Sequence, residues 1–260
     1  MKNIEVKILN PEQLKESEKM MVAMARLTQK GHTINNMHDL ENLINRAYQD
    51  STVEAMQALP HHTIKQFGSI HVAIVGASRR FLAQITRRRV GVTFMSASLQ
   101  YSDYSESAKF VVPYEITRSD FEGDMFVKHG ISNWYGSAYQ ESCEQALAEY
   151  EGAINQGIPH DAAAYMMPQG MRNVLVMSAS PHALFEIIQQ RSCKRNTLET
   201  QYVALKIWEL LEEYPMFKHA GPVCMTSKCP EGKMFCGEVP NYDSAKDFLD
   251  CEFKYIRRTK

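Results

Sequence analysis

Three consecutive arginines, Arg87 to Arg89, stand between apolar residues in the stretch QITRRRVGVTFMSASLQYS, which begins at Gln84. Three successive side chains cannot all point the same way in a helix or a strand, so part of the block must lie near its apolar neighbours. A guanidinium in such surroundings needs a carboxylate or an anionic ligand as its partner. A phosphate group would accept two parallel hydrogen bonds from it. The block therefore suggests a phosphate-binding site.

Two other interpretations of the arginine block stay open. Two of its arginines can be solvated while the third pairs with a nearby acid. A nucleic-acid surface is also conceivable, but the chain has no second basic cluster with interleaved aromatic residues. Its formal net charge of -1 offers no long-range attraction to a polyanion. We therefore expect no nucleic-acid partner.

The composition is typical of a globular protein, with 260 residues of which 44% are hydrophobic and 23% charged. No apolar run approaches the roughly 20 residues that cross a bilayer. The first residues are polar where a signal peptide needs a continuous apolar segment. We therefore expect a cytoplasmic protein without membrane contact, whose six cysteines are reduced.

Hydrophobic periodicity and end signals indicate alternating helices and strands. β-branched, apolar segments predict buried strands over 69–78 and 171–180. Predicted helices cover 11–29, 37–59, 79–89, 134–156, 181–191 and the stretch from Asn196 to the residue before Pro215. Ser180 is the expected N-cap of the helix that Pro181 opens, and Asn196 with Glu199 resembles a capping box.

We therefore predict an α/β fold, a mixed sheet flanked by helices, over residues 1–215. Residues 216–260 are richer in Gly, Pro, Lys and Cys, and we expect them to form an irregular C-terminal extension.

Polar residues on both sides of the arginine block follow a recognisable pattern. Gln84 lies three residues before the block, and Ser98, Gln100 and Tyr101 follow it across a turn that contains Gly91. This arrangement resembles the signature of the flavin-dependent thymidylate synthases. That signature has Arg-His-Arg with a Gln three residues ahead, then a short loop that ends in Ser, any residue, Arg and Tyr.

Two further segments resemble the same family and lie in the same order. His61 and Thr63 match its His-x-Ser/Thr segment. The strand and helix around Ser180 and Arg191 resemble its strand followed by a helix whose late arginine contacts the pyrimidine. The resemblance spans roughly residues 55–210 and implies the same fold.

The resemblance implies an FAD-dependent methyltransferase. Its reaction would methylate carbon 5 of a pyrimidine nucleotide, most simply dUMP to dTMP. The one-carbon unit would come from methylenetetrahydrofolate, the hydride from reduced flavin, and NADPH would reduce the flavin again. A homotetramer with active sites shared between subunits is also implied.

Site residues follow from the resemblance position by position. Arg191 would hold the uracil edge and stabilise the negative charge that develops there, which is a catalytic role. The substrate-binding residues would be Gln84, Arg87, Ser96, Ser98, Gln100 and Arg191. The cofactor-binding residues would be Thr63, Arg87, Arg88, Arg89 and His182, the last at a helix N-terminus that favours phosphate. No metal ligand is implied.

Several positions depart from the family signature. Its central histidine is Arg88 here, the arginine before its final tyrosine is Gln100, and an asparagine in the late helix is Glu186. Ser96 stands where a glutamate is usual, and a phosphate-binding arginine would fall at about Ala164. These changes favour one alternative, a relative that acts on another pyrimidine nucleotide or hydroxymethylates it. A non-catalytic homologue that binds flavin or nucleotide is the other.

Cysteines are concentrated near the C-terminus. Cys224, Cys229 and Cys236 lie within thirteen residues, with His219 and Cys251 nearby. Structural zinc sites usually draw their ligands from tighter pairs, so we favour reduced thiols without a metal. A zinc site and a disulfide between Cys224 and Cys229 stay open as alternatives.

Overall fold

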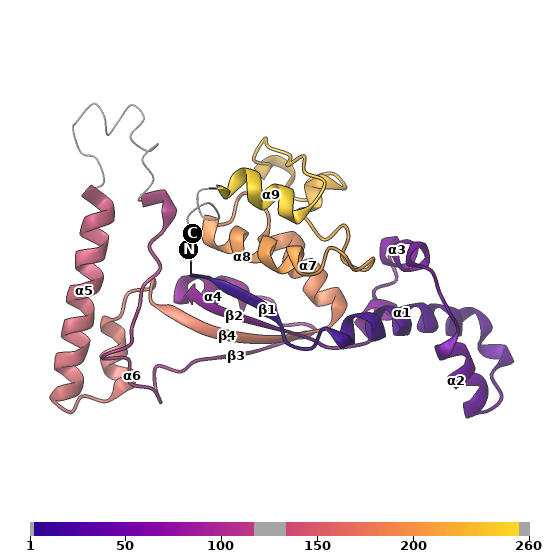
Figure 1. Cartoon of the computed structure of the whole chain (residues 1–260), viewed down its shortest axis with the longest axis horizontal. Coiled ribbons are helices and arrows are strands. Elements are labelled where there is room, and N and C mark those ends of the chain that lie inside the picture. Colours follow the sequence, from indigo (N-terminus) through magenta and orange to yellow (C-terminus); the bar gives the residue numbers. More distant parts are fainter. Residues whose placement is uncertain (1–2, 117–133, 255–260) are drawn as a thin grey trace.

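The computed structural model describes residues 3–116 and 134–254, and its strands form one four-stranded sheet within these ranges (Figure 1). The strand order is β1-β2-β4-β3, and the three pairs are antiparallel. The strands are β1 (Glu5–Ile8), β2 (Ile70–Ser78), β3 (Val92–Ser96) and β4 (Arg172–Ala179). The predicted α/β fold is confirmed.

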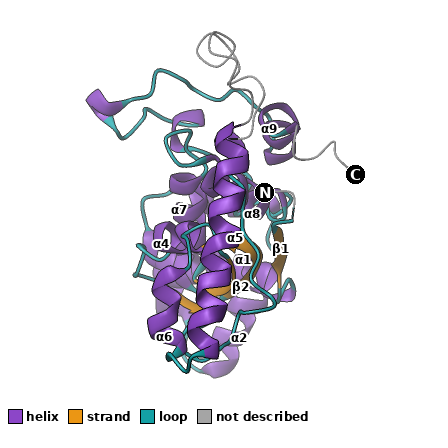
Figure 2. Cartoon of the chain, turned by 90° about the vertical axis from the view of Figure 1, so that its left-hand side faces the viewer, coloured by secondary structure: helices purple, strands orange, loops and turns teal. Residues whose placement is uncertain are grey.

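The helices lie around this sheet in three groups. They are α1 (Glu12–Lys30), α2 (Met37–Asn45), α3 (Asp50–Ala58), α4 (Arg79–Ile85), α5 (Trp134–Asn155), α6 (His160–Ala163), α7 (Pro181–Arg191), α8 (Leu198–Glu209) and α9 (Ala245–Glu252). Helices α4, α7 and α8 cover one face of the sheet, with α9 stacked on α8 (Figure 1). Helices α1 to α3 form a lobe at one end of the sheet, and α5 with α6 stands at the other (Figure 1). Figure 2 looks onto the end that carries α5 and α6.

Buried apolar and exposed side chains alternate along the strands, which explains why helices cover only one face of the sheet. In β2, Ile70, Val72 and Ile74 are fully buried under the helices, whereas His71 and Val75 point outward and are exposed. This period of two is typical of an antiparallel sheet with one face on the core. Burial of such side chains contributes about 1.5–3 kcal/mol each.

The C-terminal segment shares this core. We expected residues 216–260 to be irregular, and much of the described part is, but it also contains α9. The residues after 215 that are buried in the common core are Met216, Phe217, Ala220, Ala245, Phe248, Leu249 and Phe253. Within residues 3–116 and 134–254, no helix combines the length and the apolar composition needed to cross a bilayer.

The expected helix over 37–59 is wrong, because the chain forms α2 and α3 with an extended break between them. Arg26 on α1 donates hydrogen bonds to the carbonyl oxygens of Arg46 and Ala47, each at 2.8 Å. These carbonyls are therefore satisfied from outside the helix. The interruption is a tertiary effect of α1, not a local one.

Two other helix ends differ from the prediction. The expected helix over 79–89 ends at Ile85, so the arginine block follows it as irregular chain. The N-cap of α8 is Thr197, whose side chain accepts from the amide of Thr200, and not Asn196. Glu199 instead accepts from the amide and hydroxyl of Ser78, both at 2.6 Å.

A glycine bulge lies within β2, where this strand pairs with β4. The register shifts between Val75 and Ala77, and Gly76 between them has φ +84°, in the left-handed region. A Cβ on Gly76 would lie 2.5 Å from the carbonyl oxygen of Asn3. Backbone conformation and space both require glycine here.

Replacement of Gly76 by Ala should lower the free energy of unfolding by at least about 1–2 kcal/mol, since a left-handed alanine is strained and its methyl group meets backbone. Gly152, inside α5 with open space around its Cβ position, is the matched control. Gly152→Ala should raise stability by about 0.5–1 kcal/mol. Urea denaturation measures both changes, and equal effects at the two sites would contradict the assignment.

Candidate functional site

Basic side chains from three segments meet around one carboxylate; we call this group the basic cluster. It comprises His62, Lys65, Arg88, His182 and the carboxylate of Glu186. Arg88 Nη2 donates to Glu186 Oε2, and His182 Nε2 lies 3.3 Å from the same oxygen. The rings of His62 and His182 stack with centroids 4.5 Å apart at 26°. Residues distant in the sequence are thus joined through Glu186.

The start of α7 positions two members of the cluster. Ser180 caps the helix by accepting from an amide in its first turn, as predicted. His182 and Glu186 are four residues apart and so lie on the same helix face. The amide of Ser180 donates to the carbonyl of Gly91 at 2.8 Å, and Gly91 has φ +72°. This bond holds the chain after the arginine block against α7.

Lys65 lies on the short 3-10 helix η2 (His62–Gln66), which packs against α1 and α7. Its side chain is buried, and Nζ donates to the carbonyl oxygens of Gln57 and Leu59, both at 2.6 Å. Burial lowers the pKa of Lys65, and the charge of Glu186 opposes this.

The pKa of His182 is lowered from its ordinary value of 6.5, mainly by burial. Glu186 opposes the shift, while the charges of His62, Lys65 and Arg88 add to it. His182 is therefore neutral at pH 7. Since Nε2 faces the carboxylate, the proton sits on Nε2 and leaves Nδ1 as an acceptor.

Two buried atoms of the cluster have no hydrogen-bond partner in the protein, namely Arg88 Nε and His182 Nδ1. A buried polar group left unpaired costs about 1–3 kcal/mol, so such atoms mark places where a ligand can bind. Arg88 Nε–H would donate to an acceptor such as a phosphate oxygen. His182 Nδ1 would accept from a hydroxyl or ring N–H. The pair suits a ligand that carries both kinds of group.

A second pair of charges lies at the other end of α7. Burial lowers the pKa of the half-buried Arg191, and the nearby positive charge of Arg87 lowers it further. Two guanidinium groups held near each other attract an anion. The structure thus brings Arg87, Arg88, His182 and Arg191 along one helix, with exposed Thr63 beside His62 on η2.

The remaining predicted residues lie elsewhere. Gln84 is half-buried on α4 before the arginine block, and Arg89 is exposed. Strand β3 runs away from α7, from Val92 opposite Ala179 to Ser96 opposite Leu175. At about 3.3 Å per residue, Ser96 stands roughly 13 Å beyond Val92.

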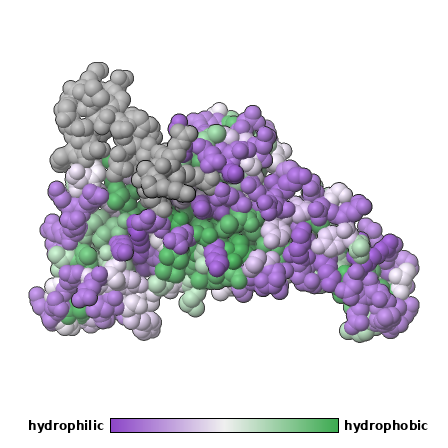
Figure 3. Space-filling model, in the orientation of Figure 1, coloured by the Kyte–Doolittle hydropathy of each residue, from purple (hydrophilic) through white to green (hydrophobic). Residues whose placement is uncertain are grey.

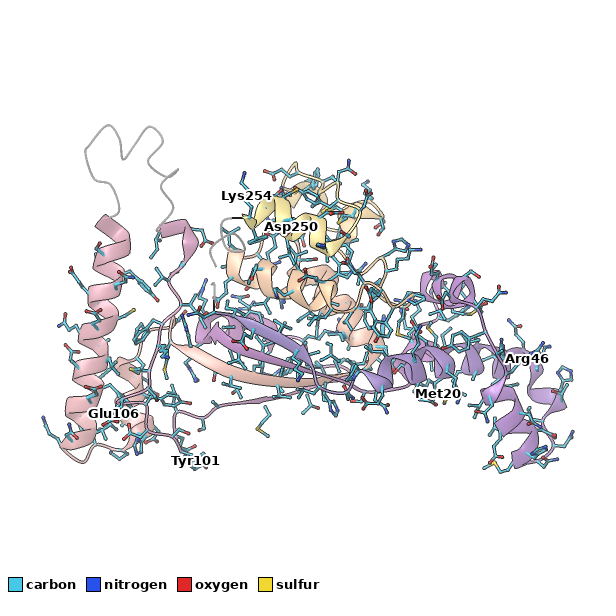
Figure 4. The ribbon with its side chains drawn as sticks, in the orientation of Figure 1. Met20, Arg46, Tyr101, Glu106, Asp250 and Lys254 are labelled. Atoms are coloured by element: carbon cyan, nitrogen blue, oxygen red, sulfur yellow. The ribbon has the colours of Figure 1, made fainter. Side chains whose placement is uncertain are left out.

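The loop after β3 continues away from α7. Ser98 Oγ accepts from the amide of Gln100 at 3.0 Å, and Tyr101 is 83% exposed. Figure 4 shows Tyr101 at the lower edge of the molecule, far from α7. Within one chain the structure does not bring Ser96, Ser98 and Gln100 to the basic cluster.

Three members of the cluster were absent from the predicted site. His61 was chosen by resemblance, but it is His62 that stacks on His182. Glu186 was noted as a departure only, although its spacing of four from His182 was a usable signal. Lys65 gave no signal, since a lysine in sequence is expected to be solvated.

A solved structure shares this fold. The UMP/dUMP methylase PolB from Streptomyces cacaoi, determined with 5-Br dUMP, superposes with a TM-score of 0.62. The two chains are 16% identical, and the match covers 84% of this chain and 94% of PolB. The two chains therefore share a fold.

The sequence family is equally clear. The model of the thymidylate synthase complementing protein family matches residues 11–215, and the chain belongs to this family of enzymes. Flavin-dependent thymidylate synthases are similar in sequence. The Geobacter sulfurreducens enzyme is 24% identical over 191 residues, covering 72% of this chain and 76% of that protein. The Nitratidesulfovibrio vulgaris enzyme is 29% identical over 205 residues, covering 77% and 81%. The resemblance drawn from the arginine block is confirmed.

Replacement of Glu186 by Gln should lower the pKa of His182 further, because it removes the charge that opposes burial. An NMR titration of the histidine rings, assigned with His182→Gln, measures the shift. Glu213→Gln, at an exposed site, is the control. An unchanged or higher pKa of His182 in the Glu186 variant would contradict the contact between the imidazole of His182 and the carboxylate of Glu186.

The same shift predicts a pH dependence of stability. A folded-state pKa below 6.5 means that the contribution of His182 is present above the unfolded value. It is lost as the pH falls through the folded value. Between pH 7 and pH 5, the free energy of unfolding should therefore fall more for wild type than for His182→Gln. Chemical denaturation at each pH measures this difference.

Proposed function

We propose that this enzyme methylates carbon 5 of a pyrimidine nucleotide with the help of a flavin, most simply dUMP to dTMP. Methylenetetrahydrofolate would donate the one-carbon unit and NADPH would reduce the flavin. The observation that carries the proposal is the pair of unpartnered buried atoms, Arg88 Nε and His182 Nδ1, in a basic cluster. Membership of the thymidylate synthase complementing protein family supports the proposal.

The basic cluster fits FAD as a ligand. Arg88 Nε–H can donate to a phosphate oxygen, and Arg87 and Arg89 are exposed beside it to add positive charge. His182 Nδ1 can accept from a hydroxyl or a ring N–H, and Thr63 adds a hydroxyl near the stacked histidines. When bound, the reduced flavin supplies the hydride that completes the methyl group.

Arg191 is the residue proposed to act on the uracil ring. Its guanidinium stays charged at any working pH, because its pKa lies far above neutrality even when lowered. From the end of α7 it would donate to a carbonyl oxygen at the edge of the ring. Negative charge that develops there when carbon 5 becomes nucleophilic would be stabilised. Gln84, Arg87, Ser96, Ser98 and Gln100 would hold the rest of the nucleotide.

One observation favours a second candidate, a substrate other than dUMP. Arg88 already pairs with Glu186, so part of its charge is not free for a ligand. Gln100 also replaces a cation of the family signature. A pyrimidine nucleotide with a different sugar, or transfer of a hydroxymethyl group, would suit this weaker positive field.

Arg88→Met should weaken FAD binding at least about tenfold, because a charged donor is worth about 1.5–3 kcal/mol. Fluorescence titration of FAD measures this, with thermal melting to check folding. Arg80→Met, an exposed arginine at the start of α4, is the matched control and should bind as wild type does. His182→Gln serves if Arg88→Met fails to fold.

Turnover with dUMP and with UMP then decides the reaction. Formation of the 5-methyl product with methylenetetrahydrofolate and NADPH supports the first candidate. Product from UMP alone, or a 5-hydroxymethyl product, supports the second. Tight flavin binding without turnover of any pyrimidine nucleotide would indicate a non-catalytic homologue, and absence of flavin binding would overturn the proposal.

We also propose that two copies of the chain complete each site, in a homotetramer. The loop that carries Ser98 stands away from Arg88 in one chain, so a partner copy would have to bring it there. The uncovered face of the sheet supports such an assembly. Its exposed apolar residues include Val75, Met95 and Val174. Figure 3 shows hydrophobic side chains gathered across the middle of the molecule.

Mixing two inactive variants tests the shared site. Arg88→Met with Ser98→Ala, unfolded and refolded together, should regain activity several-fold above either alone, because some sites receive both intact residues. Arg88→Met with His182→Gln is the control and should regain none, since both changes fall in one cluster. Light scattering gives the oligomeric state, and a monomer would contradict the assembly.

A further inference from the structure

A cavity at the C-terminal end of α7 is lined by thiols and shares Arg191 with the proposed nucleotide site. It has a volume of about 440 Å³ and is bordered by Cys193, Cys224 and Cys229. Arg191 and Arg195 also border it. None of the proposed steps of nucleotide methylation uses these cysteines.

A fourth cysteine belongs to the same group. Cys236 lies between Met234, whose carbonyl accepts from Arg195, and Glu238, which pairs with Lys194, so these contacts bring it near Cys193. All four are free, and Cys236 Sγ donates to the carbonyl of Glu238 at 3.4 Å. The sequence grouped only Cys224, Cys229 and Cys236. Cys193 was not included, because it lies 31 residues before Cys224.

Charged contacts hold the two cysteine-bearing segments together. Arg195 Nη1 donates to the carbonyl of Met234. Lys194 Nζ lies 2.9 Å from Glu238 Oε2 and 3.0 Å from Glu252 Oε1. The loop that follows α7 is thereby fixed against the segment that carries Cys224, Cys229 and Cys236.

This segment has little else to stabilise it. Residues 223–239, all within the described part of the chain, include no buried residue. Their regular structure is two 3-10 helices of three residues each. Met234 and Val239 are 58% and 55% exposed. A segment with so few apolar contacts depends on cross-links for its conformation.

We propose that Cys193, Cys224, Cys229 and Cys236 bind one Zn²⁺ ion as a structural Cys₄ site. Zinc prefers four tetrahedral ligands, and thiolates are favoured donors. Each thiol loses its proton on binding, so the occupied site carries two negative charges. Arg195 on the same cavity offsets part of this charge.

Binding must draw the thiols inward. Within 3–116 and 134–254, no group of three or more Cys, His, Asp or Glu side chains already has the geometry to hold a metal. The cavity leaves space for this closure, and the lack of buried anchors over 223–239 permits it. Metal binding and ordering of the segment are then one event.

The test uses the whole chain, purified under reducing conditions without added chelator. Mass spectrometry of metals should find about one Zn²⁺ per chain after desalting. Co²⁺ added to the metal-stripped protein should give the absorption bands of tetrahedral cobalt thiolate. Cys229→Ser should lose Co²⁺ affinity by more than about tenfold, since even the loss of a ligand's hydrogen-bond partner costs that much.

Cys251→Ser is the matched control, because Cys251 is exposed on α9 outside the cavity. It should keep the metal content and the cobalt spectrum of wild type. Reduced wild type that binds neither ion would overturn the proposal. So would equal Co²⁺ affinity of Cys229→Ser and wild type.

Discussion

The contact between Arg88 and Glu186 is the interaction on which the site depends. The arginine block follows a helix that ends at Ile85, and nothing in its own backbone fixes where its side chains go. Glu186 supplies the fixed point, because α7 is packed into the core by Leu184 and Ile187. One carboxylate on a rigid helix therefore orients a guanidinium from a loop and an imidazole from its own helix.

This contact also changes the meaning of two departures from the family signature. Read along the sequence, Arg88 for histidine and Glu186 for asparagine are separate losses. In space they meet, so a larger cation is matched by an acid that holds it. Arg88 keeps its positive charge, while the carboxylate of Glu186 reduces the free charge offered to a ligand. A change of substrate preference and retention of the fold are both compatible with such a paired replacement.

The sequence predicted those parts that depend on local chemistry. Runs of β-branched residues identified β2 and β4, and Ser180 identified the start of α7. Strands β1 and β3 have four and five residues, too few for their alternation to stand out. The break between α2 and α3 could not be predicted, because it contains no glycine or proline. It depends instead on hydrogen bonds from Arg26 of α1.

The candidate site likewise has residues that the sequence predicts and residues that it does not. The resemblance gave the positions of Arg87, Arg88 and Arg191, although the family has a histidine at the second of these. His182 was predicted from its place at a helix N-terminus. Burial of Lys65 could not be predicted, since it depends on carbonyl groups at the end of α3.

Those carbonyls give Lys65 a second role. Its ammonium group binds the last turn of α3 while its charge faces Glu186. An anion that binds the cluster therefore also strengthens the charge that ends a helix in the α1–α3 lobe. Thermodynamic linkage makes this relation reciprocal: fraying of α3 must weaken anion binding by the same free energy. The α1–α3 lobe is thus coupled through Lys65 to the proposed binding site.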